Sequence, residues 1–140
     1  MEILHRFDAP LRAVWRAWTD PERVRTWWGS DPDGVVTSAE LDVRVGGRFE
    51  ISFRDPSGDQ HTSRGEYLHV EAPTLLDFTW SWESEPGVRS RVTVELTDDG
   101  RTTAMRFVHG ELHGASEHDY APGWRRTFEK LDEVLATPDE

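Results

Sequence analysis

The sequence contains no cysteine among its 140 residues. Disulfide bonds, thiolate metal sites and cysteine nucleophiles are therefore excluded. An apolar run of membrane-spanning length is also missing, and the first apolar segment is interrupted by His5, Arg6 and Asp8. The sequence thus gives no support for secretion or membrane insertion, and we expect a cytoplasmic protein without a membrane partner.

Positive charge is scarce, because 16 Lys and Arg residues oppose 27 Asp and Glu residues, for a net charge of −11. The chain has one lysine, Lys130, and its arginines alternate with acidic residues along predicted strands instead of clustering. Nucleic-acid phosphates repel such a surface. We therefore expect no nucleic-acid partner.

Large apolar side chains are plentiful, and they include seven tryptophans. A chain of this length can bury a substantial core without external staples. No repeat, low-complexity segment or internal linker divides it. We predict a single domain over residues 1–140, in which residues 137–140 form a frayed tail.

The first thirty residues have the pattern of one strand followed by two short helices. Residues 2–8 alternate between apolar and polar side chains, whereas residues 11–18 carry an apolar face at helical spacing. Asp20 before Pro21 is an N-cap signal for a second helix. That helix is predicted to end near Gly29.

The middle of the chain alternates with a period of two, which is typical of half-buried strands. Short turns separate these segments, so we predict an antiparallel meander with one apolar and one polar face. Phe78 and Trp80 are predicted on the apolar face, and Asp77 and Thr79 on the face toward water.

The chain ends in a predicted helix over residues 116–136, whose apolar side chains form one stripe. It is the only element large enough to cover the apolar face of the sheet. Pro122 and Gly123 within it predict a kink or a later start.

Short motifs follow one another in a specific order along nearly the whole chain. They are VWRAWTDPE at 14–22, WWG at 27–29, DVRVGG at 42–47, GEY at 65–67, FTW at 78–80 and GW at 123–124. Together they resemble the heat-shock-protein-90 ATPase activator C-terminal-like family of the START-like (SRPBCC) superfamily. The resemblance implies an α+β helix-grip fold, β-α-α-β(6)-α, in which a bent antiparallel sheet wraps a long C-terminal helix.

A bent sheet and a straight helix often leave a space between them in this fold, so we predict an apolar ligand cavity there, with a filled aromatic core as the alternative. The Trp27-Trp28 pair either closes the cavity mouth or anchors a helix end. The predicted cavity residues are Trp28, Phe49, Phe53, Tyr67, Phe78, Trp80, Met105, Phe107, Trp124 and Phe128.

Two further motifs invite other chemistry. His109, Glu111, His113, His118 and Asp119 are all of ligand types for zinc. They span a strand end and a loop without helical spacing, so we predict a solvated acidic loop and no metal site. Gly46-Gly47 precedes no helix and therefore predicts a turn or bulge rather than a phosphate loop.

No catalytic residue and no cofactor is predicted, because nothing resembles a strained serine elbow. The sequence thus predicts a non-catalytic domain that binds a small hydrophobic or aromatic molecule, as a monomer or homodimer. One alternative is a cyclase- or hydrolase-like enzyme that uses the same cavity, which a buried ionisable group there would favour. The other is a co-chaperone-like interaction module, which a dry, closed core would favour. The activators also have a separate N-terminal domain, so this chain alone is not expected to stimulate a chaperone.

Overall fold

The computed structural model describes residues 1–29, 33–114 and 120–136, except for the side chains of residues 111 and 113. Seven strands form one antiparallel sheet in the order β1-β7-β6-β5-β4-β3-β2. The strands are β1 (Glu2–Phe7), β2 (Val35–Leu41), β3 (Arg48–Arg54), β4 (Gln60–Glu71), β5 (Leu75–Trp82), β6 (Arg89–Asp98) and β7 (Thr103–His113). The first strand thus lies beside the last, and the five links from β2 to β7 form the predicted meander.

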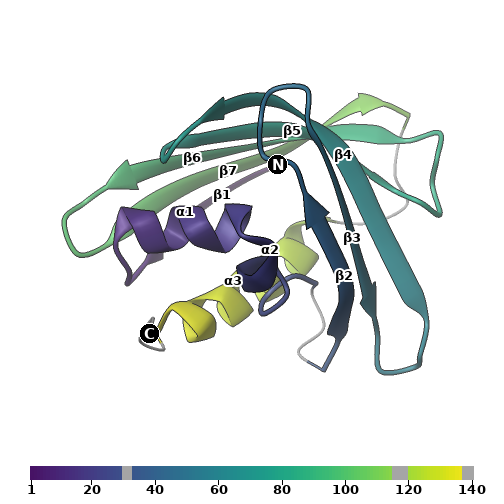
Figure 1. Cartoon of the computed structure of the whole chain (residues 1–140), viewed down its shortest axis with the longest axis horizontal. Coiled ribbons are helices and arrows are strands. Elements are labelled where there is room, and N and C mark those ends of the chain that lie inside the picture. The colour runs from purple at the N-terminus through teal and green to yellow at the C-terminus, as the bar shows by residue number, and fades with distance from the viewer. Residues whose placement is uncertain (30–32, 115–119, 137–140) are drawn as a thin grey trace.

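The sheet is strongly bent and arches over the helices, which all lie on its concave side (Figure 1). The helices are α1 (Leu11–Thr19), α2 (Pro21–Val24) and α3 (Tyr120–Ala136). The predicted α+β helix-grip architecture is therefore confirmed. The side chain of Asp20 caps α2 as predicted, because its Oδ1 accepts a hydrogen bond of 3.0 Å from the Glu22 amide.

Helix α3 starts at Tyr120 in the described residues, and positions 116–119 of the predicted helix lie outside them. Pro122 consequently falls in the first turn, where its missing N–H has no intrahelical partner to lose. The proline is compatible with this late start.

The strand alternation places Phe78 and Trp80 on the concave face, where they are 3% and 4% exposed. Asp77 and Thr79 lie on the opposite face as predicted, but Thr79 is only 6% exposed and does not face water. Asp77 does not face water either, since its side chain is only 4% exposed. Its Oδ1 accepts a hydrogen bond from Arg91 Nε at 2.8 Å, and its Oδ2 lies 2.9 Å from His69 Nδ1. Burial alone would raise the pKa of this carboxyl, but the hydrogen bonds and charges of Arg91 and His69 lower it.

At two glycines the backbones approach too closely for a side chain. A Cβ atom on Gly65 would lie 1.8 Å from the carbonyl oxygen of Thr79 in the neighbouring strand. A Cβ atom on Gly47 would lie 2.0 Å from the carbonyl oxygen of Asp42. Gly46 has a φ of +85°, so the Gly46-Gly47 pair forms the predicted turn.

We expect Gly65→Ala to destabilise the fold by more than about 2 kcal/mol, because β4 and β5 would have to separate to admit the methyl group. Gly110→Ala is the matched control, since Gly110 also lies in a strand but a Cβ atom there would meet nothing within 4 Å. Urea unfolding of both variants measures the difference. Equal midpoints would show that the β4–β5 approach does not require glycine.

Candidate functional site

Aromatic side chains from every layer meet around Trp124 of α3. Its ring centroid lies 4.6 Å from that of Phe107 on β7, 5.4 Å from Trp80 on β5 and 5.6 Å from Trp28 after α2. Phe128, one turn further along α3, stacks on Trp124 at 5.7 Å. This cluster occupies the space between the long helix and the concave face, where the sequence predicts the ligand site.

The predicted cavity residues are all buried, and the structure brings most of them together in two groups. The first group is the cluster around Trp124. The second consists of Phe49, Tyr67 and Phe78, whose ring centroids lie 5.2 to 5.9 Å apart. Phe53 and Met105 are buried in the same core, at 8% and 2% exposure. In the described residues, the ring of Phe53 contacts His61 and Trp82 but neither of the two groups.

The second group, together with Trp18, Val24, Trp28, Leu41, Ile51 and Leu76, lines a cavity of about 10 Å³. A space of that size holds one water molecule at most. In the conformation described, this part of the core is therefore closely packed. Burial also raises the pKa of the Tyr67 hydroxyl well above its ordinary value, and the charge of Asp42 adds to this effect.

A buried histidine connects α3 to the sheet through a chain of hydrogen bonds. The indole Nε1 of Trp124 donates to His109 Nδ1 at 2.9 Å, and His109 Nε2 lies 2.7 Å from the hydroxyl of Ser90. That hydroxyl in turn donates to the carbonyl oxygen of Trp80 at 3.1 Å. Tyr120 stacks on the imidazole at 4.1 Å between ring centroids.

The chain of hydrogen bonds fixes the tautomer of His109. An indole N–H can only donate, so Nδ1 must accept and the imidazole proton must sit on Nε2, which donates to Ser90. Burial, assisted by the nearby N-terminal amino group, lowers the pKa of His109 to about 3. The ring is therefore neutral at physiological pH.

His109 is the buried ionisable group that would favour an enzyme, but its chemistry fits a structural role better. Both ring nitrogens are engaged by Trp124 and Ser90. A base with a pKa of about 3 is also poorly matched to proton transfer near neutral pH. The ring is thus suited to orienting Trp124.

Several buried donors of the core have no acceptor within the part of the chain that the structure describes. They include the Ser63 hydroxyl and the Trp80 indole N–H on the concave face, and the Trp18 indole N–H on α1. Ser63 pairs with Trp82 across the β4–β5 ladder, and Trp80 is the next inward-facing residue of β5. An unsatisfied buried donor costs roughly 1–3 kcal/mol. An acceptor supplied from outside the described residues would recover that free energy.

Polar contacts hold the second half of α3 as well. The His5 Nε2 on β1 lies 2.9 Å from the Asp132 carboxylate. Lys130 donates to the backbone carbonyl oxygens of Trp28 at 3.4 Å and Gly29 at 3.2 Å. The preceding Trp27 is fully buried and donates to the Ala17 carbonyl at 2.8 Å, so it anchors α2 to α1.

The predicted solvated histidine loop needs a correction at His109, which is 4% exposed within β7. Its position two residues after Phe107 places it on the inward face of β7, but its polar partners lie on other elements and could not be identified from the local sequence. His118 and Asp119 lie outside the described residues, as do the side chains of Glu111 and His113. No group of potential metal ligands occurs among the side chains that are described.

Sequence reasoning missed several members of the site. Trp18 and Tyr120 carried a signal, because both lie on apolar helical stripes. Ser63 and Ser90 had none, since an inward-facing serine looks like any polar strand residue until its pairing partner is known.

The comparison with known families assigns the chain. The family described as "Activator of Hsp90 ATPase homolog 1-like protein" matches residues 8–136. The chain belongs to this family. No curated protein matches the chain.

Solved structures of bacterial proteins show the same fold as this member of the AHSA1 family. A protein from Chromobacterium violaceum has a TM-score of 0.85 at 22% identity, covering 99% of this chain and 97% of its own. The AHSA1 protein from Silicibacter pomeroyi has a TM-score of 0.77 at 20% identity, covering 97% and 96%. CalU16 from Micromonospora echinospora is similar at 26% identity and a TM-score of 0.69, covering 96% and 74%. None of the helices in the described ranges has the length and apolar character needed to cross a bilayer.

The low pKa of His109 predicts a specific loss of stability in mild acid. The unfolded chain binds this proton near pH 6.5 and the folded chain near pH 3. Protons therefore favour the unfolded state, and stability falls as the pH drops below about 6.5. Between pH 7 and pH 4.5 we expect a loss of roughly 2–3 kcal/mol from this residue.

The His109→Gln variant tests this prediction, because glutamine can accept from Trp124 and donate to Ser90 but does not titrate. Urea unfolding across this pH range should show a flatter pH dependence for the variant than for the wild type. The prediction fails if the two curves run parallel.

Proposed function

We propose that this domain binds a small, mainly apolar or aromatic molecule that carries one hydrogen-bond acceptor, between α3 and the concave face of the sheet. The fold and the family support a ligand-binding or co-chaperone-like domain in general. The observation that favours a ligand is the pair of buried donors, Ser63 and Trp80, without an acceptor in the described residues. A core built only for packing gains nothing from such groups.

The aromatic rings around these donors suit an aromatic ligand. The Trp80 ring lies 4.9 Å from Trp82, 5.3 Å from Tyr120 and 5.4 Å from Trp124, between ring centroids. Such rings offer large apolar area and favourable edge-to-face contacts. The guest would stack on these rings and give its acceptor to Ser63 or Trp80.

The N-terminal half of α3 is the natural moving part for ligand entry. The contacts of Lys130 and Asp132 join its C-terminal half to Trp28, Gly29 and β1, whereas the Trp124 indole is hydrogen-bonded to His109 and packed against aromatic rings. Tyr120 and Trp124 swing outward together if this end of the helix shifts, and the rings of Trp80 and Phe107 are then uncovered. Ligand binding would thus be coupled to the position of one helix end.

A pair of matched compounds tests the acceptor requirement. 2-Acetylnaphthalene and 2-ethylnaphthalene have similar apolar bodies, but only the first has a carbonyl oxygen. We expect wild-type protein to bind the ketone roughly fivefold to tenfold more tightly, because one hydrogen bond of about 1–1.4 kcal/mol separates them. Ligand-detected NMR measures both affinities, and failure of both compounds to bind would contradict the proposal.

Two serine variants provide the controls. Ser63→Ala removes an unsatisfied hydroxyl, so it should leave stability unchanged or raise it while reducing the preference for the ketone. Ser52→Ala removes a hydroxyl that is bonded to Thr62 at 2.8 Å on the other face of the sheet. It should lower stability by about 1 kcal/mol and leave the preference intact.

Trp124→Leu should weaken binding of both compounds by more than it weakens folding.

The closely packed core and the family name favour a second candidate, a co-chaperone that binds the chaperone through its surface. An equimolar amount of this chain is expected not to raise the ATPase rate of the chaperone of its host. Steady-state ATP hydrolysis with and without the chain provides the measurement. A several-fold stimulation would favour the co-chaperone function over the ligand-binding one.

A further inference from the structure

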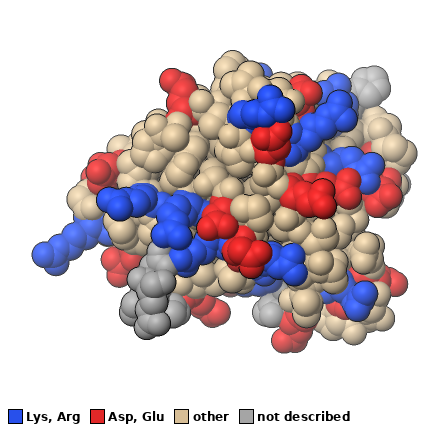
Figure 2. Space-filling model, in the orientation of Figure 1, with Lys and Arg blue, Asp and Glu red and all other residues tan. Residues whose placement is uncertain are grey.

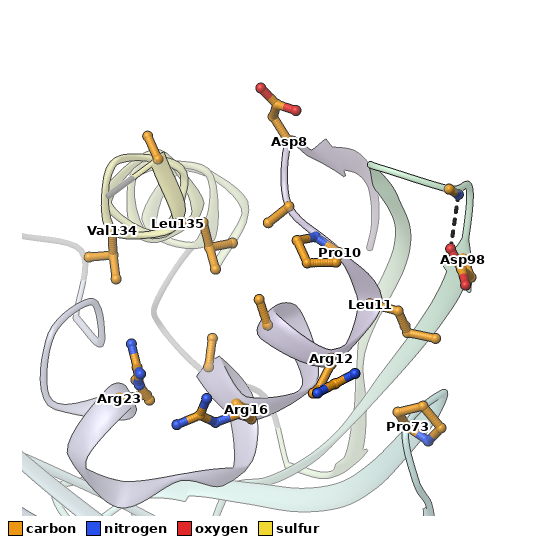
Figure 3. Close-up of a pocket in the computed structure, with 15 residues that line it drawn as sticks. Asp8, Pro10, Leu11, Arg12, Arg16, Arg23, Pro73, Asp98, Val134 and Leu135 are labelled. Carbon is orange, nitrogen blue, oxygen red and sulfur yellow. Dashed lines mark hydrogen bonds between the residues drawn. The ribbon is translucent and has the colours of Figure 1, made fainter. Parts of the chain in front are cut away.

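A second hollow lies on the outside of the molecule, apart from the space between α3 and the sheet. It is a cleft of about 680 Å³ between α1, the last turn of α3 and the β6–β7 turn (Figure 3). Small-molecule sites commonly have volumes of a few hundred to about 1,000 Å³. The cleft is therefore large enough for a small organic ligand.

One side of the cleft is basic in a chain that is acidic overall. Arg12 and Arg16 lie one turn apart on α1, and Arg23 on α2 lines the same space. In Figure 3 Arg16 and Arg23 extend into the space below Val134. Figure 2 shows basic side chains gathered over the position that α1 occupies in Figure 1.

Two carboxylates also line the cleft. Asp98 accepts a hydrogen bond of 2.9 Å from the Gly100 amide and is thus turned toward its own turn. Asp8 points away from the arginines in Figure 3. A guanidinium has five N–H donors, so an arginine that already has a partner can still bind a further oxygen atom.

The other side of the cleft is apolar. Val134 and Leu135 point from α3 into the cleft, and Pro10 lies across from them, whereas Leu11 lines the cleft on the other side of α1. Both α3 residues are only half-buried, so apolar surface remains available within the cleft. Guanidinium groups beside an apolar wall match a molecule that has an anionic head and a short hydrocarbon body.

We propose that this cleft binds a small anionic amphiphile, with its carboxylate or phosphate on Arg16 and Arg23 and its hydrocarbon along Val134 and Leu135. Arginine binds both head groups through paired N–H donors. The site is independent of the one proposed between α3 and the sheet, because its lining contains no tryptophan and faces solvent. Its affinity should fall with salt, since a charge is recognised at a solvent-exposed surface.

Octanoate, octyl phosphate and 1-octanol are the probes, and isothermal titration calorimetry measures their binding. We expect the two anions to bind at least tenfold more tightly than the alcohol. The ratio between octanoate and octyl phosphate distinguishes a carboxylate site from a phosphate site. Equal affinity for the alcohol would overturn the proposal, as would anion affinity that does not change between 20 and about 300 mM salt.

The Arg16→Gln/Arg23→Gln double variant should lose at least tenfold in octanoate affinity, whereas Arg48→Gln on the outer face of β3 should lose none. Circular dichroism and thermal unfolding check that both variants fold. NMR of the wild-type protein gives a test that needs no variant. Octanoate should shift the methyl signals of Val134 and Leu135, and a shift confined to the Trp80 indole N–H would place the ligand inside the core and refute the cleft.

Discussion

The concave face of the sheet has to be covered, and α3 is the only long helix in the described residues that lies against it. The face carries Phe78, Trp80 and Phe107, which would otherwise remain in water. The burial of this face is the constraint from which the rest of the structure follows. It fixes where α3 lies and explains why α1 and α2 fill the remaining space beside it.

Apolar packing alone does not define the rotation of a helix on a curved sheet. In this domain the rotation is set by polar groups inside the aromatic core. Trp124 has to direct its N–H at His109, and His109 has to direct its own proton at Ser90. These directional bonds fix the side of α3 that faces the sheet, whereas the Ser63 hydroxyl and the Trp80 indole N–H have no partner within the described residues.

Much of the fold could be predicted from the sequence, because two patterns in it are local. They are the spacing of apolar residues along a helix and the alternation of side chains between the two faces of a strand. The alternation around Phe78 and Trp80 gave their orientation, and Asp20 before Pro21 gave the start of α2. The burial of Asp77 could not be predicted, since it depends on Arg91 and His69 from neighbouring strands.

The candidate site was less predictable than the fold for the same reason. The aromatic residues were identified because they recur on one side of a helix or on one face of a strand. Their burial follows from that spacing. His109 was assigned to a solvated loop because it was grouped with the polar residues between Glu111 and Asp119, whereas its partners in space lie on β6 and α3. Whether packed rings open for a guest is a property of side-chain contacts and helix motion, on which residue order alone carries no information.

The single lysine has a practical meaning for chemical labelling. Its ammonium group lies against the carbonyl oxygens of Trp28 and Gly29, at the point where α3 meets the end of α2. Acylation of this side chain would remove its positive charge and place a bulky amide against those carbonyls. An amine-reactive reagent therefore has one side-chain target in the whole chain, and a modification at that position would mark the contact between α3 and the segment that follows α2.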